Sequence, residues 1–471
     1  RRRVHRRRFS LEKCPVRGEK ELMDTIASIA TAVGAGGIAV IRISGPEAKS
    51  VLSRVFAPHV PQKMSSRMLT YGYVMENGQK VDECMAVWMR APHTYTTEDV
   101  AEIQCHGGQV TAQRVLDVVL RSGARLAEPG EFTKRAFFGG RIDLTQAEGV
   151  MDLISARTER AARAGLQQMG GYLSERIHAL QSELLDTIAY IEAYLDYPDE
   201  DIEPLTAEKA AQQARAVQKE LESALKNARA GRMLSGGVRI VLAGSPNTGK
   251  SSLLNGLLRE QRAIVTATAG TTRDVLREEL NLNGLPVQLT DTAGLREASD
   301  EVERIGIDRA REELRGADVV LLVIDRSRPL GEEEKALLGQ PGAPLVVALN
   351  KSDLDAVTTD AEVHKLSPQA KIVDTCAKTG EGVETLRQTL YETALRGASP
   401  EEAYLTNERH IQAARTAAEA IGRALEALNT HTLDCAALDL RAAWEALGAI
   451  TGENTTEDIV DRIFAKFCLG K

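Results

Sequence analysis

Apolar and polar residues alternate in different ways along different parts of the chain. Over 24–143, short apolar runs end at glycines or turn residues, which predicts strands interspersed with short helices. Over 144–236, apolar residues recur every three or four positions, as on the buried side of long helices. Residues 237–397 return to apolar strands separated by helical segments, and 398–471 are again helical in pattern. The predicted fold is α/β plus α, with an N-terminal α/β domain, a central helical bundle domain, and a mostly parallel α/β domain inserted into the bundle.

One apolar stripe defines the first long helix of the bundle. Its members follow one another at intervals of three and four: Leu173, Ile177, Leu180, Leu184, Ile188, Ile191 and Leu195. A second helix is expected over 207–230, and the run Ser235-Gly236-Gly237 predicts a flexible junction before the inserted domain. Residues 397–400 (GASP) form the other junction. Small residues and proline at both ends are typical of sites that tolerate the insertion of a domain.

The inserted domain opens with a loop whose sequence predicts phosphate binding. An apolar strand at 238–243 is followed by Gly244 and then by Gly249, Lys250 and Ser251, which fits G-x-x-x-x-G-K-S without a mismatch. The two glycines let backbone N–H groups point at a phosphate chain beside the N-terminus of the next helix. Lys250 is placed to reach the β- and γ-phosphates, and the Ser251 hydroxyl is placed to ligate Mg²⁺.

Three further motifs follow in the order that a GTPase requires. Threonines at 271–272 lie on a loop where they can complete the Mg²⁺ shell and sense the γ-phosphate. Asp291 begins an Asp-x-x-Gly motif after an apolar strand, so its carboxylate can hold a metal-bound water while the Gly294 N–H meets the γ-phosphate. After another strand, the motif at 350–353 (NKSD) ends in Asp353, which can accept both the N1–H and the 2-amino group of guanine. Adenine lacks this donor pair, so the motifs together predict a guanine-nucleotide domain.

The residue after the Asp-x-x-Gly motif departs from the Ras pattern. Leu295 occupies the position at which Ras-like proteins carry the glutamine that orients the attacking water. Because an apolar side chain cannot hold that water, another group must do so. The candidates are acids downstream, most of which are expected to form only a solvated loop and a helix N-terminus: Glu297, Asp300, Glu301 and Glu303.

The composition is that of an ordinary globular protein of 471 residues with few aromatics and a net charge of −8. Residues 1–20 hold nine Lys or Arg and two Glu, and this start could be a transit peptide, a nucleic-acid arm, a misjudged start codon or a plain tail. We favour the last two and assign 1–23 as a disordered or non-native basic extension. Since the remainder is acidic, contact with RNA would need a local basic patch or a partner.

The cysteines and the hydropathy pattern exclude two classes of protein. The six cysteines are scattered and form no C-x-x-C pair, which argues for a reducing compartment and against structural zinc. No apolar run is long and clean enough to span a bilayer. We therefore expect a cytoplasmic protein without a membrane contact.

From Asp24 to Lys471 the chain closely resembles the MnmE (TrmE) family of tRNA modification GTPases. The most specific shared segments are 129–137 (PGEFTKRAF), 143–148 (DLTQAE), 291–307 and the C-terminal 467–471 (FCLGK). The resemblance implies an N-terminal domain that forms a homodimer and binds 5,10-methylene- or 5-formyl-tetrahydrofolate, and a helical domain that carries the GTPase domain. It also implies an FAD-dependent partner, MnmG (GidA), in a heterotetramer or larger assembly. Together they would add an aminomethyl or carboxymethylaminomethyl group to C5 of the wobble uridine of tRNA.

The same resemblance implies which residues serve GTP hydrolysis. Mg²⁺ falls to Ser251 and Thr272, and the acid that orients the attacking water matches Glu303. A K⁺ ion, across which two GTPase domains meet, falls to Asn247, Thr266, Thr268 and Thr271. The expected GTP contacts are then Asn247, Thr248, Gly249, Lys250, Ser251, Ser252, Thr266, Thr271, Thr272, Asp291, Thr292, Ala293, Gly294, Asn350, Lys351, Asp353, Cys376, Ala377 and Lys378.

Folate contacts map by resemblance to Arg42, Glu102, Arg141 and Lys471. Cations suit the glutamyl carboxylate of folate, and a carboxylate suits its amino-pterin edge. Some family members have lysine at position 141, and arginine keeps the charge but not the compact shape. Cys468 is either an inert thiol on a fraying tail or a catalytic nucleophile or one-carbon relay. We expect the catalytic role, because its apolar neighbours give the tail something to bury and nearby cations would favour the thiolate.

Two other functions remain open from the sequence. A ribosome-assembly GTPase of the Era or Der type also has an apolar residue after Asp-x-x-Gly, but such proteins carry a basic RNA-binding domain and lack the Cys-Leu-Gly-Lys end found here. A GTP-binding switch or scaffold that only positions a partner is the other possibility. The wobble uridine of tRNA distinguishes the three, since only the first hypothesis requires it to be modified.

Overall fold

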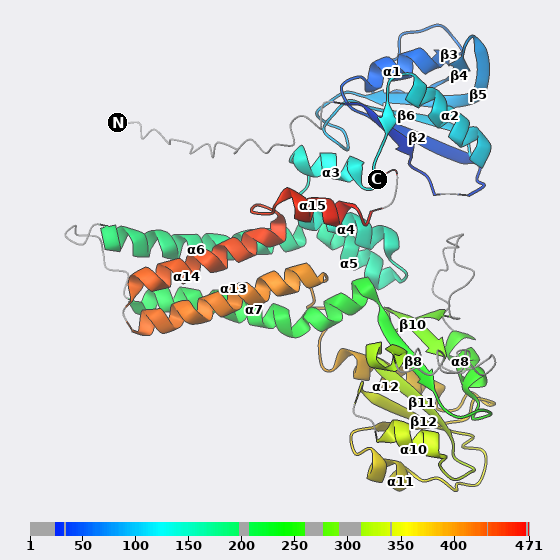
Figure 1. Ribbon diagram of the computed structural model, residues 1–471, viewed down its shortest axis with the longest axis vertical. Coiled ribbons are helices and arrows are strands. Elements are labelled where there is room, and N and C mark those ends of the chain that lie inside the picture. The colour runs from blue at the N-terminus through cyan, green and yellow to red at the C-terminus, as the bar shows by residue number, and fades with distance from the viewer. Residues whose placement is uncertain are drawn as a thin grey trace. The chain divides into compact units, whose positions relative to one another are not determined.

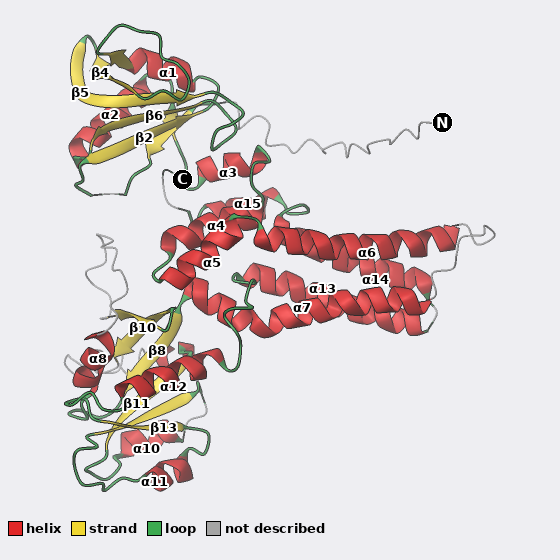
Figure 2. Cartoon of the chain, turned by 180° about the vertical axis from the view of Figure 1, so that it is seen from behind, coloured by secondary structure: helices red, strands yellow, loops and turns green. Residues whose placement is uncertain are grey.

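A computed structural model describes residues 24–32, 34–196, 207–259, 277–291, 312–339, 342–430, 432–467 and 470. The chain forms two compact units, Arg1–Asp143 with Thr455–Lys471 and Leu144–Asn454. Figures 1 and 2 show its helices and strands from opposite sides. The predicted α/β plus α fold is confirmed. Among the described helices, none combines the length and the apolar character that crossing a membrane requires.

The first unit is built on a seven-stranded sheet in the order β3-β4-β5-β6-β2-β1-β7. Neighbouring strands are antiparallel except β1 and β7, which are parallel. The strands are β1 Ile26–Ile29, β2 Ile38–Ser44, β3 Phe56–Pro58, β4 Thr70–Glu76, β5 Gln79–Met89, β6 Val100–His106 and β7 Arg125–Leu126. Alternate residues of β2 and β6, such as Ile41 and Ile103, are buried with helices α1 (Ala48–Val55) and α2 (Gln109–Arg121) on one face. Their intervening residues face the other side, as the period of two requires.

Two short helices belong to this unit as well, α3 (Glu131–Phe138) and α15 (Glu457–Phe464). They pack on each other, and the rings of Phe464 and Phe467 lie 4.9 Å apart beside Gly130. Gly130 has a φ of 72°, and a Cβ there would meet the Phe464 carbonyl oxygen at 2.6 Å. This close approach explains why Thr455–Lys471 group with the first unit, whereas the sequence placed them at the end of the helical domain.

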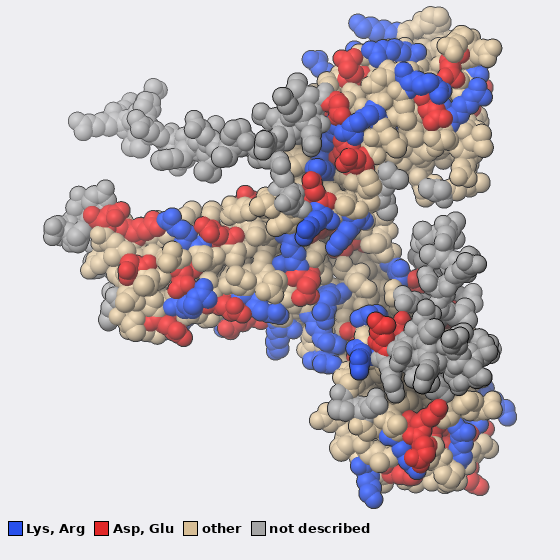
Figure 3. All heavy atoms as spheres, viewed as in Figure 1, with Lys and Arg blue, Asp and Glu red and all other residues tan. Residues whose placement is uncertain are grey.

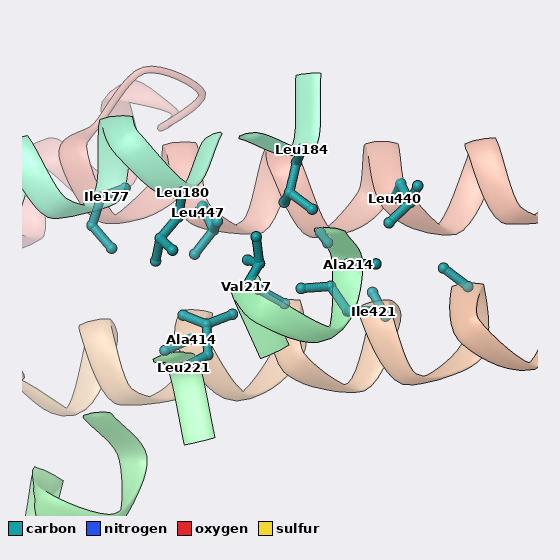
Figure 4. Packing of buried hydrophobic residues seen from close by; sticks show 14 of the residues in the cluster. Ile177, Leu180, Leu184, Ala214, Val217, Leu221, Ala414, Ile421, Leu440 and Leu447 are labelled. Atoms are coloured by element: carbon teal, nitrogen blue, oxygen red, sulfur yellow. The ribbon is translucent and has the colours of Figure 1, made fainter. Parts of the chain in front are cut away.

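The second unit contains the helical bundle. Its helices are α4 Leu144–Ser155, α5 Glu159–Met169, α6 Tyr172–Asp196, α7 Ala207–Gly236, α13 Glu408–Asn429 and α14 Leu433–Thr451. Leu180 and Leu184 of the predicted stripe meet Val217 of α7, Ile421 of α13 and Leu440 of α14 in one core (Figure 4). Segments on both sides of the GTPase sequence therefore share a single hydrophobic core. Buried alanines along α13 let that helix lie close to its neighbours.

The predicted flexible junction at 235–237 is wrong. Helix α7 continues through Gly236, and the N–H of Gly237 donates to the Met233 carbonyl as a helix C-cap does. Met233 and Leu234 are buried against the GTPase sheet, so burial outweighs the low helix propensity of glycine at this point. The long helix thus leads directly into the first strand of the GTPase sheet.

The GTPase sheet has six strands in the order β13-β12-β11-β8-β10-β9, all parallel to their neighbours except β9. The strands are β8 Val238–Ala243, β9 Arg277–Leu282, β10 Leu285–Asp291, β11 Val319–Asp325, β12 Leu345–Asn350 and β13 Lys371–Thr375. Helices α8 (Lys250–Arg259) and α12 (Val383–Leu395) contribute to the core on one face. Helices α10 (Glu332–Leu338) and α11 (Asp360–Leu366) contribute to the core on the other. Ligand loops are expected at the carboxyl ends of such parallel strands.

Candidate functional site

The phosphate loop joins β8 to α8 and has the backbone that its sequence predicts. Gly244 and Gly249 have φ values of 140° and 94°. A Cβ at Gly244 would meet the Val323 carbonyl oxygen at 2.4 Å, so only glycine fits beside β11. Asn247 is exposed and takes the left-handed conformation with φ 63°. The loop is therefore shaped by its glycines, as nucleotide-binding loops of this type are.

Lys250 lies at the start of α8 and is nearly buried. Its Nζ donates to the carbonyl oxygens of Gly244 and Ser245 at 2.8 and 2.9 Å, so the ammonium group lies inside the ring of the loop. Ser251 and Ser252 follow in the first turn of α8 and are exposed. Thr248 is fully buried, and its hydroxyl donates to the Ser245 carbonyl at 3.0 Å. A cation and an exposed hydroxyl therefore lie beside a helix N-terminus, where phosphate and Mg²⁺ are favoured together.

The predicted guanine motif at 350–353 is hydrogen-bonded to the phosphate loop through Asn350. The Asn350 amide donates to the Thr248 carbonyl at 2.8 Å, and its side-chain oxygen accepts from the Ala377 N–H at 3.0 Å. Asp353 is exposed, and one of its carboxylate oxygens accepts from the Cys376 thiol at 3.3 Å. Lys378 is exposed beside the same loop. The structure thus brings together the phosphate loop, the predicted guanine motif at 350–353 and the expected GTP contacts at 376–378.

Asp325, at the end of β11, belongs to this site but was not predicted. Its carboxylate accepts from Lys351 Nζ at 2.6 Å and from the Ser327 N–H at 3.0 Å. Burial alone would raise the pKa of Asp325, but these hydrogen bonds outweigh burial and lower the pKa below its ordinary value. The ion pair holds the Lys351 side chain while its backbone has φ 66°. The available signal was a carboxylate at the end of an apolar strand in a parallel sheet.

Several predicted GTP-site residues lie outside the described part of the chain. These are Thr266, Thr268, Thr271, Thr272, Thr292, Ala293, Gly294 and Glu303. Asp291 is described as the last residue of β10, paired in register with Leu242 of β8. That pairing places its backbone at the same edge of the sheet as the phosphate loop. The assignments of the other residues stay predictions.

The predicted folate residues gather on the face of the first sheet opposite α1 and α2. Arg42 of β2 and Glu102 of β6 are register partners, and the Arg42 Nε donates to the Glu102 carboxylate at 2.9 Å. Both side chains are about one-fifth exposed, at 23% and 20%. The guanidinium of Arg141 donates to the Tyr95 carbonyl at 3.1 Å. Three of the four predicted residues therefore lie together.

Tyr95 organises this site and was not predicted. The guanidinium carbons of Arg42 and Arg141 lie 5.5 and 4.9 Å from the centre of its ring, so both arginines make cation–π contacts with Tyr95. Its hydroxyl lies 2.9 Å from that of Thr133 in α3, which fixes the ring. Phe132 adds a second ring 5.8 Å from Arg42. The partly exposed guanidinium, carboxylate and tyrosine groups suit a flat anionic ligand.

Cys468 and Lys471 lie outside the described residues, whereas Gly470 between them is described and buried. Gly470 has φ 90°, and a Cβ there would meet the Ile29 carbonyl oxygen at 2.2 Å. Ser28 of β1 pairs in register with Arg42, so this part of the C-terminus lies one strand from the folate residues. Burial raises the pKa of Cys84 to about 12 and that of Cys105 to about 11, which makes both thiols poor nucleophiles.

Comparison with known proteins decides the family. The family described as "MnmE helical domain" matches residues 144–468, and the family described as "GTP-binding protein TrmE N-terminus" matches residues 25–141. The chain belongs to the MnmE family. A protein of Bacillus velezensis named tRNA modification GTPase MnmE is 44% identical over 459 residues, covering 95% of this chain and 100% of that protein. A protein of the same name from Heliobacterium modesticaldum is 43% identical over 463 residues, covering 95% of this chain and 99% of that protein.

A solved structure resembles one third of this MnmE-family chain. The G domain of the T. maritima FeoB iron transporter is 30% identical, covers 33% of this chain and 98% of its own, and has a TM-score of 0.26. The sequence had left open a ribosome-assembly GTPase of the Era or Der type. The match of residues 25–141 to a TrmE N-terminus, outside the GTPase domain, favours the MnmE family over that alternative.

Proposed function

We propose that this chain hydrolyses GTP while it modifies tRNA, adding an aminomethyl or carboxymethylaminomethyl group to C5 of the wobble uridine. The observation that carries the proposal is the hydrogen bond from Asn350 to Thr248, because it joins a base-reading loop to a phosphate loop. The match of both the N-terminal and the helical segments to MnmE supplies the tRNA substrate. The one-carbon unit would come from 5,10-methylene- or 5-formyl-tetrahydrofolate.

In GTP binding, Lys250 would exchange the carbonyls of Gly244 and Ser245 for β- and γ-phosphate oxygens. The exchange would need little movement of the side chain, because the ammonium group already lies within the loop. Asp353 would accept from guanine, while Ala377 and Lys378 would pack over the base. Asn350 would hold these loops at a fixed separation, so that only a nucleotide with a guanine and a phosphate chain reaches both.

The cations that the family implies fit the described residues. The exposed Ser251 hydroxyl, beside Lys250, suits Mg²⁺, which prefers oxygen ligands and substrate phosphates. The exposed Asn247 side chain offers a carbonyl oxygen from a left-handed loop position, which suits K⁺. Both cations would neutralise charge that develops on the phosphates. Thr272 would complete the Mg²⁺ shell, and Thr266, Thr268 and Thr271 would complete that of K⁺.

Glu303 would orient the water that attacks the γ-phosphate, since Leu295 cannot. A carboxylate that holds this water lowers the barrier by positioning and leaves ground-state GTP binding unchanged. Both residues lie outside the described part of the chain, so this role is carried by the family resemblance.

The folate would lie across Tyr95, with Arg42 and Arg141 facing its glutamyl carboxylate. Glu102 is held by Arg42, and would turn toward the amino-pterin edge when that edge arrives. Lys471 would add a third cation, and Cys468 would act as the nucleophile or one-carbon relay. The buried Gly470 against β1 supports both roles, because it fixes the chain between them.

The chain would act as a homodimer through its N-terminal domain, with an FAD-dependent MnmG partner that supplies the redox chemistry. In the view of Figure 3, Lys/Arg and Asp/Glu are interspersed over the bundle. A surface of mixed charge does not by itself bind a polyanion tightly. The partner would therefore supply much of the contact with tRNA.

Mass spectrometry of wobble uridines in a deletion strain tests the proposal. Complementation with the native chain should restore the C5 modification, whereas Lys250→Ala and Cys468→Ser should each fail to do so. GTP hydrolysis by the purified proteins separates the two failures, since only Lys250→Ala should abolish it. An unmodified wobble position in the strain complemented with the native chain, or full modification with both variants, would refute the proposal.

A further inference from the structure

The hairpin formed by β9 and β10 lies in the sequence between two of the predicted GTPase motifs. It begins directly after residues 260–276, which contain the predicted threonine motif, and it ends at Asp291, the first residue of Asp-x-x-Gly. Its turn consists of Asn283 and Gly284, which both have positive φ, at 51° and 92°. Such a turn matches the twist of the paired strands, so β9 and β10 form a regular two-stranded ribbon that joins the two predicted motifs.

The hairpin turn is hydrogen-bonded to the helical domain through Thr158. The Thr158 hydroxyl donates to the Gly284 carbonyl at 2.7 Å, and the side chain is only 5% exposed. The same hydroxyl accepts from the Ala161 N–H at 3.2 Å and thereby caps the N-terminus of α5. One side chain thus starts a helix of the bundle and holds the turn of the hairpin.

Two arginines flank Thr158 on the same surface. Arg157 forms an ion pair with Glu279 of β9, and these side chains are 40% and 29% exposed. Arg160 lies against the turn so closely that a Cβ on Gly284 would meet its Cδ at 2.9 Å. Arg160 also donates to the Tyr391 hydroxyl of α12 at 3.3 Å. The contact is largely polar, and half-exposed ion pairs of this kind are readily broken and re-formed.

Strand pairing connects this contact to the nucleotide site. β10 pairs with β8 from Val238 to Leu242, and the phosphate loop begins two residues after that pairing ends. A paired strand transmits a displacement along its length because its ladder of hydrogen bonds resists bending. A shift at Asp291 would therefore reach Gly284, and through Thr158 would reach α5.

We propose that the β9–β10 hairpin is a lever through which the nucleotide bound to the GTPase domain sets the orientation of the helical domain. Thr158, Arg157 and Glu279 are its positioning residues. The inference rests on the proposed GTP hydrolysis and names the place where that reaction is coupled to the rest of the chain. A permanent contact that holds the two domains in one arrangement is the alternative.

The test measures a distance in the full-length protein in two nucleotide states. Dyes are attached through genetically encoded azides that replace Leu438 on α14 and Val357 in the GTPase domain, which are 71% and 52% exposed. Energy transfer between them is compared with GDP and with a non-hydrolysable GTP analogue. The native chain should show two different distances. Thr158→Val and Arg157→Glu should each remove the difference and slow wobble-uridine modification by roughly fivefold or more, with GTP affinity unchanged.

Rescue and control variants distinguish loss of the lever from a general disturbance of the fold. Thr158→Ser keeps the hydroxyl and should keep the response, and Glu279→Arg should restore it in the Arg157→Glu protein by reversing both charges. Arg163→Glu is the matched control, because Arg163 lies on α5, the helix that Thr158 caps, and its 71% exposed side chain forms an ion pair with Glu159 of the same helix. It should behave as the native chain does.

Two results would overturn the lever. One is a native chain that hydrolyses GTP but shows one distance in both nucleotide states. The other is a full response in both Thr158→Val and Arg157→Glu. A native chain that binds the analogue but never hydrolyses GTP would contradict the proposed function instead, and the two-state distance measurement would still decide the lever.

Discussion

The side-chain amide of Asn350 donates a hydrogen bond of 2.8 Å to the backbone carbonyl of Thr248. On its other side, the Asn350 oxygen accepts from the Ala377 N–H at 3.0 Å and from the Thr375 hydroxyl at 3.4 Å. A Cβ on Gly249 would lie 2.2 Å from the Asn350 nitrogen, so glycine at 249 leaves room for this side chain. One residue, 2% exposed, therefore joins the loops that follow three strands of the sheet.

Asn350→Ala should weaken the binding of GTP and GDP equally. The substitution leaves buried groups of three loops without partners, at a cost on the order of 2 kcal/mol, or about 30-fold in affinity. Equilibrium titration with fluorescent nucleotides measures the effect. Asn255→Ala on the exposed side of α8 is the matched control and should bind as the native chain does. Equal affinities in the two variants would show that Asn350 is not the joint between the loops.

Asp353→Asn should exchange a preference for guanine for one for xanthine. On the proposed role, the carboxylate would accept from both guanine donors, which an amide cannot do, so discrimination between the two bases should fall by about 10⁴-fold. Affinities for GTP and XTP measured side by side report the change. Asp355→Asn, two residues away and also exposed, serves as the control. Unchanged GTP affinity in the Asp353 variant would show that Asp353 does not recognise the base.

Potassium should accelerate GTP hydrolysis, and sodium should not replace it. The exposed Asn247, in a left-handed loop position, offers an oxygen ligand to a potassium ion. That ion would neutralise the charge of the transition state, as an arginine finger does in other GTPases. Rates in matched potassium and sodium buffers test this directly. Asn247→Lys should lose most of the potassium-stimulated rate, and equal rates of the native chain in the two buffers would refute the prediction. A fully potassium-dependent Asn247→Lys protein would leave Asn247 as a turn residue only.

The sequence could predict the described loops of the candidate GTP site because each of their motifs is local. A phosphate loop needs glycines at a fixed spacing between a strand and a helix, and both Gly244 and Gly249 have the positive φ expected of that role. The guanine motif likewise ends a strand at Asn350. Asp325 was not predicted because its place in the site depends on Lys351, which directly follows the neighbouring strand β12. Only the pairing of β11 with β12 brings the two together.

Contacts made across long stretches of sequence could not be predicted from local pattern. Tyr95 lies in a loop with no periodicity, and only the fold carries it to Arg42, more than fifty residues earlier in the chain. Helix α7 runs through Gly236 because tertiary burial of its last turn outweighs glycine propensity. Glu148 belongs to a segment that resembles the family, yet its partners Arg409 and His410 lie beyond the whole GTPase domain.

Tyr95→Ala should weaken folate binding while Tyr95→Phe preserves it. The ring faces two guanidinium groups, and its loss should cost about 1–2 kcal/mol, or roughly tenfold in affinity. Phenylalanine keeps the ring and loses only the contact with the Thr133 hydroxyl. Calorimetric titration with 5-formyl-tetrahydrofolate measures both. Equal binding by the alanine variant and the native chain would place the folate elsewhere.

A buried ion cluster holds the helical bundle together where α4, α13 and α14 meet. Glu148 accepts from Arg409 at 2.8 Å and lies 2.6 Å from the Nε2 of His410, which is fully buried. Arg409 also donates to the Ile450 carbonyl at 2.9 Å. Burial alone would raise the pKa of Glu148, but the charges and hydrogen bonds of His410 and Arg409 outweigh burial and lower the pKa to about 2.

This cluster predicts that the bundle loses stability in acid. The ordinary pKa of a glutamate is 4.5 and that of folded Glu148 is about 2, so the carboxylate stabilises the fold fully above pH 4.5. Its contribution declines as the pH falls toward 2 and is on the order of 3 kcal/mol. Asp152 acts in the opposite direction, because burial raises its pKa and its charged form is disfavoured in the fold. Urea unfolding between pH 7 and pH 3 measures the balance, with Trp444 as reporter in a Trp88→Phe background.

Glu148→Gln separates the cluster from other acidic groups. It keeps the shape of the side chain but leaves the fully buried His410 and the one-fifth exposed Arg409 without their carboxylate, so stability at pH 7 should fall by about 3–5 kcal/mol. The slope of stability against pH below 4.5 should flatten in this variant, because the group that titrates there is gone. Glu159→Gln is the matched control, since Glu159 forms an ion pair with Arg163 on the same bundle but is 88% exposed, and it should change stability by less than about 1 kcal/mol. A Glu148→Gln protein that keeps both the native stability at pH 7 and the native acid slope would show that the cluster contributes nothing to either. The acid sensitivity of the bundle would then have to come from other carboxylates.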